Sequence, residues 1–198
     1  MNLNFHYAKF LTSAISYPCH HVNQNGIEIA FIGYSNSGKS TAINFLTNKK
    51  KISRVSKSPG RTNMINFFYI NSVLRFVDLP GYGYSIYHKY QEKEIYYLIL
   101  KYLKFRKCLK GIILFIDIRR LLREMDKKML NFLKNKPVNL VILLTKCDKI
   151  NQNNQNKILF IFKKKIALYS KNIEIILFSS FYKKSKKDLL NIIQTWII

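Results

Sequence analysis

Eight consecutive residues have the types and the order that hold the phosphates of a nucleotide. They match the pattern G-x-x-x-x-G-K-[ST] and are Gly33, Tyr34, Ser35, Asn36, Ser37, Gly38, Lys39 and Ser40. The glycines allow a tight loop whose backbone N–H groups point at phosphate oxygens. In such a loop Lys39 reaches the β- and γ-phosphates as a candidate catalytic group, and the Ser40 hydroxyl is a candidate Mg²⁺ ligand. An ordinary glycine-rich turn is the alternative, but the pattern arises by chance in only about one chain in a hundred of this length.

A second group of residues has the chemistry needed to read a guanine base. It consists of Thr145, Lys146, Cys147 and Asp148. The Asp148 carboxylate can accept hydrogen bonds from both N1–H and the exocyclic amine of guanine, and adenine lacks that pair of donors. The aliphatic stem of Lys146 can lie over the base. A solvated loop is the alternative for T-K-x-D alone, but its place one strand and helix after the other motifs favours GTP over ATP.

Two segments between these motifs are candidates for sensing the γ-phosphate. Asp78, Leu79, Pro80 and Gly81 match D-x-x-G, so that Asp78 can hold Mg²⁺ and the Gly81 N–H can lie near the γ-phosphate. Upstream lies the loop Ser58–Thr62, where Thr62 could complete the Mg²⁺ shell only when a γ-phosphate is present. Such a segment orders with GTP and relaxes after hydrolysis. A simple Pro-Gly turn is the alternative for this loop.

These residues require strand ends and helix starts to position them, and the apolar pattern supplies both. Short β-rich runs alternate with helix-length amphipathic segments, which predicts an α/β fold with a mainly parallel sheet and helices on both faces. Six strands are predicted: Ile27–Ile32, Ile65–Ile70, Leu74–Leu79, Gly111–Asp117, Asn139–Thr145 and Ile173–Phe178. Helices are predicted to begin at Gly38, near Gln91, near Leu122, near Gln155 and at Ser185, the last with Trp196 as a core anchor.

One pair of strands cannot be parallel. Only Asn71, Ser72 and Val73 separate the second predicted strand from the third, which is too short for a parallel crossover. The two strands must form an antiparallel hairpin. We therefore expect one antiparallel edge strand in the six-stranded sheet.

Length and composition indicate one folded domain with a strongly basic surface. The chain has 198 residues, of which 48% are hydrophobic, and three scattered cysteines that suit neither a disulfide framework nor a zinc motif. No apolar run approaches the roughly 18 to 20 residues of a membrane helix, and no secretory or transit peptide is evident, which favours a cytosolic protein. The formal charge of +24 favours a polyanionic partner such as nucleic acid. The alternative is AT-rich codon usage, which also produces Lys, Asn and Ile.

Taken together, the motifs resemble those of the EngB family of bacterial GTPases, which belongs to the TrmE-Era group. The resemblance runs from about Lys9 to the end of the chain. Beyond the phosphate loop it is carried by Phe10–Ala14, Gly60–Thr62, Asp78–Tyr84, Ile116–Arg119 and Thr145–Asp148. Asp-Leu-Pro-Gly-Tyr-Gly-Tyr is its most specific part.

The resemblance implies a Ras-like P-loop GTPase fold, with residues 25–198 as one GTPase domain and residues 1–24 as an extension packed on it. It implies a slow Mg²⁺-dependent GTPase that acts in the cytoplasm as a monomer, in assembly of the large ribosomal subunit and in cell division and septation. Its partners would be GTP, GDP and the subunit precursor, with its ribosomal RNA and proteins, and no membrane. It adds nucleotide contacts at Thr41, Gly60, Arg61, Asn63 and Met64, and a guanine-backing segment at Phe178, Ser179 and Ser180.

The sequence departs from the family at Tyr34, where Arg is usual, at Arg120-Leu121, where His-Pro is usual, and at Thr41, which is often Ser. Tyr82 occupies the place where Ras-like enzymes carry a water-orienting Gln, so we expect slow hydrolysis that rests on charge stabilisation and on help from a partner. In the related TrmE proteins an Asn at the place of Asn36 helps to hold K⁺, which suggests a K⁺ site. An Asx turn is an equally good interpretation of Asn36.

Two other functions remain open at this point. An ATP-dependent P-loop kinase would explain the phosphate loop but neither Asp148 nor the hairpin after Thr62. The second alternative is a structural or division protein that uses nucleotide for assembly in the manner of septins, without a ribosomal role. Nucleotide-dependent polymers would favour this second alternative.

Overall fold

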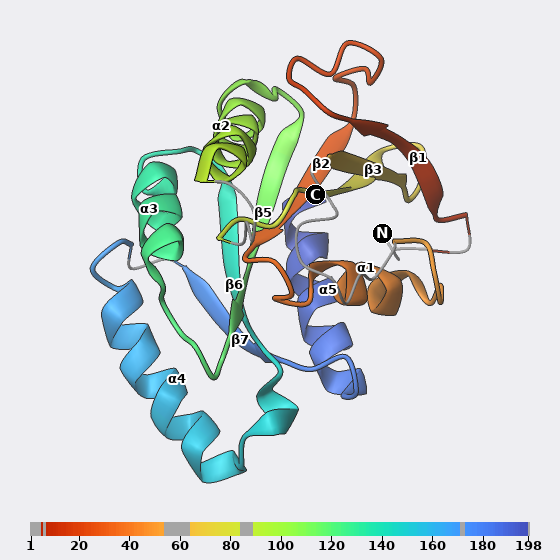
Figure 1. The fold of residues 1–198 in the computed structure, drawn as a ribbon. Coiled ribbons are helices and arrows are strands. Elements are labelled where there is room, and N and C mark those ends of the chain that lie inside the picture. The colour runs from red at the N-terminus through yellow and green to blue at the C-terminus, as the bar shows by residue number, and fades with distance from the viewer. Residues whose placement is uncertain (1–4, 6, 54–63, 84–88, 171–172, 198) are drawn as a thin grey trace.

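A computed structural model describes residues 5, 7–53, 64–83, 89–170 and 173–197. Seven strands alternate with five α-helices and one 3₁₀ turn in the described part (Figure 1). In chain order the elements are β1 (Lys9–Ala14), β2 (Ile27–Gly33), α1 (Lys39–Thr47), β3 (Ile65–Tyr69), β4 (Leu74–Asp78), α2 (Lys89–Phe105), β5 (Leu109–Asp117), α3 (Glu124–Leu133), β6 (Asn139–Thr145), the 3₁₀ turn Cys147–Lys149, α4 (Gln152–Ile166), β7 (Glu174–Phe178) and α5 (Lys183–Ile197).

The strands form one mostly parallel sheet in the order β1-β3-β4-β2-β5-β6-β7. Strands β4, β2, β5, β6 and β7 are parallel to one another, and β3 pairs antiparallel with β4 through the predicted hairpin. The predicted α/β class, the hairpin and the six strands are therefore confirmed. Phe67 faces Val77 in the hairpin register, so both strands present apolar residues to the same face.

The sheet has seven strands rather than six because β1 adds an edge outside β3. β1 pairs antiparallel with β3, with Ala14 opposite Ile65. Its sequence, KFLTSA, leaves Lys9, Phe10 and Leu11 exposed and buries only Ala14. An edge strand with one neighbour and little burial has no strong alternation of apolar residues, so the hydrophobic pattern does not reveal it. The antiparallel region thus comprises β3 and the edge pairing of β1.

Alternate residues of the central strands point into two separate cores. Ala30, Ile112 and Ile142 face the side covered by α2, α3 and α4, whereas Ile113 and Val141 face the side covered by α1 and α5 (Figure 1). A strand buried on both faces reads as a nearly continuous apolar run, as seen in Gly111–Asp117. Trp196 is 8% exposed and packs in the α1–α5 core, as predicted.

A buried ion pair joins the amino end of β2 to the carboxyl end of α2. Glu28 is fully buried and accepts hydrogen bonds from Arg106 Nε at 2.8 Å, Tyr102 OH at 2.7 Å and Arg75 Nε at 2.9 Å. Burial alone would raise the pKa of Glu28, but Arg106, Tyr102 and Arg75 hold it below its ordinary value. Arg106 also donates to the Val22 carbonyl at 3.1 Å, so the cluster anchors the segment that precedes β2.

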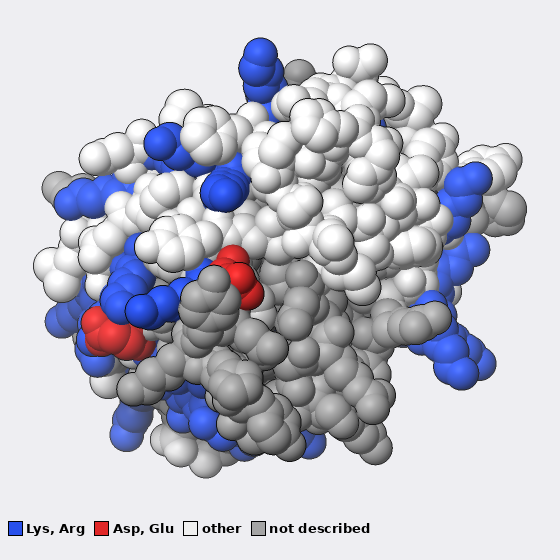
Figure 2. Space-filling model, turned by 45° about the horizontal axis from the view of Figure 1, so that its top comes forward, with Lys and Arg blue, Asp and Glu red and all other residues white. Residues whose placement is uncertain are grey.

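Among the charged residues of the chain, the 34 Lys and Arg outnumber the 10 Asp and Glu. In Figure 2 Lys and Arg side chains project along the sides of the visible face, while Asp and Glu side chains appear at few places. None of the helices among the described residues is both long enough and apolar enough to cross a membrane.

Candidate functional site

Four predicted motif segments meet at the carboxyl edge of the sheet. Ser40 Oγ donates to Asp78 Oδ2 at 2.8 Å, which joins the phosphate loop to the end of β4. Thr145 Oγ1 donates to the Ser37 carbonyl at 2.8 Å, which joins the loop to the end of β6. Ser179, after β7, is bonded to Asp148. Since ligand sites of α/β proteins form at this edge, the arrangement has the form of a nucleotide site.

The phosphate loop runs from the end of β2 into the first turn of α1. Gly33 has φ 149° and Gly38 has φ 103°, conformations that favour glycine at both motif positions. Lys39 folds back over the loop and donates from Nζ to the carbonyls of Gly33 at 3.1 Å and Tyr34 at 3.0 Å. The N–H groups of Ser35 and Ser37 donate to the Tyr82 and Tyr34 carbonyls at 3.1 Å each, and the amino end of α1 follows directly, where a helix favours an anion.

Lys39 and Asp78 are two buried groups of opposite charge at the phosphate loop, 7% and 2% exposed. Burial lowers the pKa of Lys39 to about 8, although the nearby Asp78 and Asp126 carboxylates oppose this. Burial raises the pKa of Asp78, against the effects of Lys39, Ser40 and Ser53. In both residues burial disfavours the charged form. A phosphate near Lys39 and a cation near Asp78 would supply the missing charge partners.

The surroundings of Asp78 fit Mg²⁺. Asp78 Oδ1 is buried and has no hydrogen-bond partner among the described residues, while Oδ2 accepts from Ser40 at 2.8 Å and Ser53 at 3.2 Å. A hydroxyl and a carboxylate oxygen side by side are ligands that Mg²⁺ accepts. The described residues include no cluster of three or more His, Cys, Asp or Glu for a different metal.

The D-x-x-G segment lies directly against the phosphate loop. Ser35 N donates to the Tyr82 carbonyl at 3.1 Å, and Ser35 Oγ donates to the Gly81 carbonyl at 3.2 Å. A Cβ added at Gly81 would lie 2.7 Å from the Ser35 backbone, so only glycine fits there. Any movement of Gly81 toward a γ-phosphate therefore changes its contacts with the loop.

Tyr82 is a buried structural link rather than an exposed catalytic side chain. It is 1% exposed, and its hydroxyl donates to Asp126 Oδ1 at 2.8 Å in the first turn of α3. Asp126 Oδ2 accepts from Arg123 N at 3.1 Å, and the Arg123 guanidinium lies 3.1 Å from the centroid of the Tyr34 ring. The phosphate loop, the D-x-x-G segment and α3 are thus joined by one cluster. In this position the Tyr82 side chain cannot orient a water molecule.

The T-K-x-D segment, predicted to read guanine, is held from two sides. Lys146 has φ 59°, and its Nζ donates to the Asn36 carbonyl at 2.8 Å and pairs with Asp117 Oδ2 at 3.0 Å. Burial would raise the pKa of Asp117, but hydrogen bonds from Arg119 and Lys146 lower it well below its usual range. On the other side Ser179 Oγ donates to Asp148 Oδ1 at 2.7 Å. The Lys146 ammonium group and the Asp148 carboxylate are therefore both held by contacts within the protein.

Some of the other predicted nucleotide contacts lie in the part of the chain that the structure describes, and some lie outside it. Four of them are buried, namely Leu79, Pro80, Cys147 and Phe178. Two are partly exposed, namely Thr41 and Ser180. Met64, just before β3, is 37% exposed. Gly60, Arg61, Thr62 and Asn63 lie outside the described residues, as does Tyr84.

Three residues that contact the site are not among the predicted nucleotide or metal contacts. Ser53 bonds Asp78, Asp117 holds Lys146, and Asp126 holds Tyr82. Asp117 ends the strand next to β6, so the rule that polar residues at neighbouring carboxyl ends converge points to it. Ser53 and Asp126 carry no comparable signal in the sequence, because their partners are distant along the chain.

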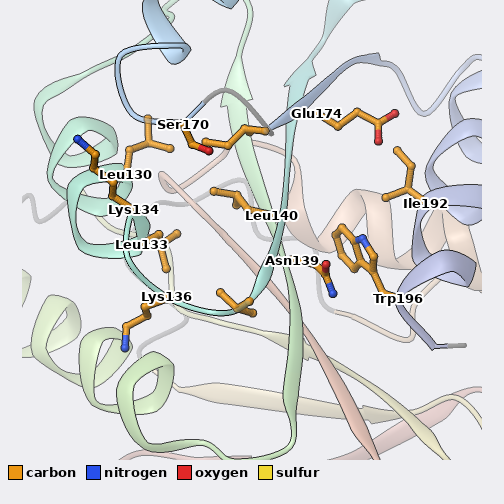
Figure 3. Close-up of a pocket in the computed structure, with 12 residues that line it drawn as sticks. Leu130, Leu133, Lys134, Lys136, Asn139, Leu140, Ser170, Glu174, Ile192 and Trp196 are labelled. Atoms are coloured by element: carbon orange, nitrogen blue, oxygen red, sulfur yellow. The ribbon is translucent and has the colours of Figure 1, made fainter.

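A separate cavity of about 260 Å³ lies at the opposite edge of the sheet (Figure 3). Leu130 and Leu133 of α3, Leu140 of β6 and Trp196 of α5 line it, with Glu174 at the start of β7. None of the predicted nucleotide residues lines it. This cavity is therefore not the nucleotide site.

Comparisons with known proteins agree with this geometry. The family described as "50S ribosome-binding GTPase" matches residues 28–146. A probable GTP-binding protein EngB of Buchnera aphidicola subsp. Acyrthosiphon pisum is 50% identical over 166 residues, which cover 81% of this chain and 78% of that protein. The same-named protein of Coxiella burnetii is 43% identical over 189 residues, with 96% and 92% covered.

Solved structures give the same picture of the fold. The crystal structure of a probable GTP-binding protein engB superposes with a TM-score of 0.66 at 25% identity, covering 86% of this chain and 98% of that one. A structure of Era in complex with MgGDPNP and a segment of 16S ribosomal RNA has a TM-score of 0.68 at 22% identity, covering 88% and 57%.

Proposed function

Because this chain belongs to the EngB family of GTP-binding proteins, we propose that this GTPase is a switch in assembly of the large ribosomal subunit. In this proposal the GTP-bound form binds a subunit precursor, made of ribosomal RNA and proteins, and leaves it after hydrolysis. The work takes place in the cytoplasm, with the protein acting as a monomer, and supports normal cell division and septation. The name of the matching family, a 50S ribosome-binding GTPase, and the +24 charge support the ribosomal partner.

The proposed nucleotide site uses the segments that converge at the carboxyl edge of the sheet. Lys39 and the loop N–H groups of residues 33–41 would bind the β- and γ-phosphates, and Asp148 would accept from the guanine base while Ser179 holds the carboxylate in place. Thr145–Cys147 and Phe178–Ser180 would surround the base. The convergence of Lys39, Asp78 and Asp148 on one edge is the observation that carries this assignment.

Ser40 and Asp78 would hold Mg²⁺, with Thr62 as the further ligand of the GTP-bound state. Bound there, Mg²⁺ would neutralise charge on the β- and γ-phosphate oxygens. Asp78 Oδ1, buried without a partner in the described part of the chain, is the atom available for it. Ser53 also bonds Asp78 and lies nine residues before Thr62 in the sequence.

Hydrolysis would depend on positioning and charge rather than on a side-chain base. Lys39 would stabilise charge on the phosphates, and Gly81, whose carbonyl accepts from Ser35 Oγ in the phosphate loop, would offer its N–H to the γ-phosphate. Tyr82 is committed to Asp126 and leaves the water without a side-chain partner. We propose that hydrolysis is slow until a partner, or K⁺ near Asn36, supplies further positive charge. Asn36 is exposed, which leaves it accessible to an ion.

We also propose that residues 25–198 form the GTPase domain and residues 1–24 an extension packed on it. β1 pairs with β3 at the sheet edge, and Phe10 lies edge-on to Phe68 with ring centroids 5.9 Å apart. Cys19 and Val22 are buried in the core that includes α2. These contacts support the packing of the extension.

The switch is tested by sedimenting cell extract that contains the tagged protein through a sucrose gradient. We expect the protein to migrate with large-subunit particles when a non-hydrolysable GTP analogue is present, and at the top of the gradient with GDP. Migration that is the same with both nucleotides would contradict a switch. Nucleotide-dependent polymers free of ribosomal particles would instead favour the septin-like alternative.

A further inference from the structure

The end of α1 and the start of α5 together form a basic surface that the nucleotide site does not use. We call it the α1–α5 surface. Its members are exposed side chains that follow α1 or surround the first turn of α5: Lys50, Lys51, Phe181, Tyr182, Lys183, Lys184 and Lys187. Of these, Phe181 is 76% exposed and Tyr182 45% exposed.

Lys186 brings the two halves of this surface together. Its Nζ donates to the Phe45 carbonyl at 2.8 Å and to Asn48 Oδ1 at 2.5 Å, at the carboxyl end of α1. Lys183 and Lys187 lie three residues before and one residue after Lys186 on α5, so they flank this contact. Lys50 follows Asn48 by two residues and therefore lies within roughly 7 Å of it along the chain.

The charge of the surface is unbalanced. Lys50, Lys51, Lys183, Lys184 and Lys187 form no ion pair within the part of the chain that the structure describes. Helix α1 contains no acidic residue, and α5 contains only Asp188. Neighbouring like charges within about a Debye length repel each other, and a polyanion would relieve that repulsion.

The two exposed rings, Phe181 and Tyr182, indicate which kind of polyanion the surface can bind. Phe181 and Tyr182 lie side by side in the chain just before Lys183 and Lys184, on the turn between β7 and α5. Unpaired bases stack on exposed aromatic rings while lysines contact the adjacent phosphates. A double-stranded helix keeps its base faces covered, so it would leave the rings unused. The combination therefore fits single-stranded RNA.

The surface is attached to the nucleotide site at both ends. Phe181 N donates to Ser179 Oγ at 3.2 Å, and the same Ser179 Oγ donates to Asp148. At the other end, Lys51 lies two residues before Ser53, whose hydroxyl bonds Asp78. Occupancy of the base and metal sites can thus alter the placement of the rings and of the lysines.

We propose that the α1–α5 surface binds an unpaired stretch of ribosomal RNA, with bases on Phe181 and Tyr182 and phosphates on the five lysines. This inference rests on the proposed function for the source of the RNA, and it names the contact site on this protein. Helix α4 is also basic and carries one exposed ring, Phe160 at 61%, whose face is already contacted by Lys164 Nζ at 4.4 Å from the ring centroid. The α4 lysines therefore provide a matched control.

The test measures binding of the full chain to a fluorescein-labelled, single-stranded RNA of about 12 nucleotides by fluorescence anisotropy. Lys50→Glu/Lys183→Glu/Lys187→Glu is compared with Lys163→Glu/Lys164→Glu/Lys165→Glu, which changes the net charge equally. We expect the first variant to bind at least about tenfold more weakly and to lose about 2 from the salt-dependence slope, since each phosphate contact contributes about 0.7. The control should bind within about twofold of wild type.

Phe181→Ala tests the stacking contribution at constant charge. We expect about tenfold weaker RNA binding, as for loss of one stacked base. Circular dichroism and urea unfolding establish that each variant is folded. Equal RNA affinity of the two charge-reversal variants, or a larger loss in the α4 control, would overturn the assignment.

Gradient sedimentation with the GTP analogue separates this inference from the proposed function. Suppose that wild type and the Lys50→Glu/Lys183→Glu/Lys187→Glu variant both migrate with ribosomal particles. Binding of ribosomal RNA by the α1–α5 surface is then refuted, while the proposed switch function is retained. If the variant loses oligonucleotide binding but wild type never migrates with particles, RNA binding by the α1–α5 surface is supported and the ribosomal function is refuted.

Discussion

The buried carboxylate of Asp126 makes a quantitative prediction about stability and pH. Asp126 is 1% exposed, and burial raises its pKa from 3.8 to about 6, although Tyr82, Arg123 and Lys39 each favour the ionised form. A shift of about two units corresponds to about 3 kcal/mol between the two protonation states. Because the folded-state pKa is raised, this stabilisation is present below pH 3.8 and is lost as the pH rises through 6.

The matched variant is Asp126→Asn, which has a similar shape and does not titrate. Relative to this variant, wild type should lose about 2 kcal/mol of unfolding free energy between about pH 4.5 and 7.5, the part of the total that falls in that interval. The measurement is urea unfolding of both proteins at several pH values and constant ionic strength. Using the difference between them removes the titration of all other groups.

Tyr82→Phe is a second variant that tests the same prediction. It removes the hydroxyl that donates to Asp126 at 2.8 Å, so the pKa of Asp126 should rise further and the loss of stability should move to higher pH. A difference between wild type and Asp126→Asn that does not change with pH would refute the reasoning about this cluster.

Four further predictions concern the nucleotide site and the fold. Asp148→Asn should bind GTP at least about 100-fold more weakly and should admit xanthosine triphosphate, because the amide replaces one of the two accepting oxygens with a donor NH2 group; unchanged GTP affinity in a titration would contradict this. Lys39→Met should lower single-turnover GTP hydrolysis at least about 100-fold, since the charge near the phosphates is lost. Turnover in K⁺ should exceed turnover in Na⁺ at equal ionic strength, and equal rates would remove the K⁺ proposal for Asn36. Arg106→Ala should cost about 3 kcal/mol in urea unfolding because Glu28 stays buried, and a loss below about 1 kcal/mol would show that Arg75 and Tyr102 suffice.

The sequence predicts the parts of this fold that depend on strong local patterns. The central strands are continuous apolar runs buried on both faces, and Asn139–Thr145 occurs with its predicted bounds. The hairpin follows from a connection too short for any parallel crossover. Helix α5 begins at Lys183, two residues before the predicted start at Ser185. Exposed lysines do not contribute to the spacing of apolar residues from which the start was predicted.

Features that depend on long-range contacts could not be predicted in this way. β1 is held by its pairing with β3 rather than by its own apolar pattern. The link from Tyr82 to Asp126 joins residues 44 apart, and nothing in either local sequence indicates the partner. Tyr82 itself was recognisable as unsuited to orient water, but its burial against α3 depends on the packed structure.

At the nucleotide site, too, local motifs could be predicted and long-range side-chain contacts could not. The phosphate loop, D-x-x-G and T-K-x-D motifs specify which residue types can meet a nucleotide, and the α/β fold places Lys39, Asp78 and Asp148 at one edge. How Asp148 is held by Ser179, and Lys146 by Asp117, depends on side-chain packing between neighbouring strand ends.

The most direct test of this account is calorimetric titration of the protein with GTP and with ATP, each with and without Mg²⁺. We predict that GTP binds, that its affinity falls when Mg²⁺ is removed, and that ATP gives no measurable binding at the same concentrations. Binding of ATP as tightly as GTP would contradict the assignment of Asp148 as the base reader. GTP binding that is indifferent to Mg²⁺ would contradict the metal site at Ser40 and Asp78.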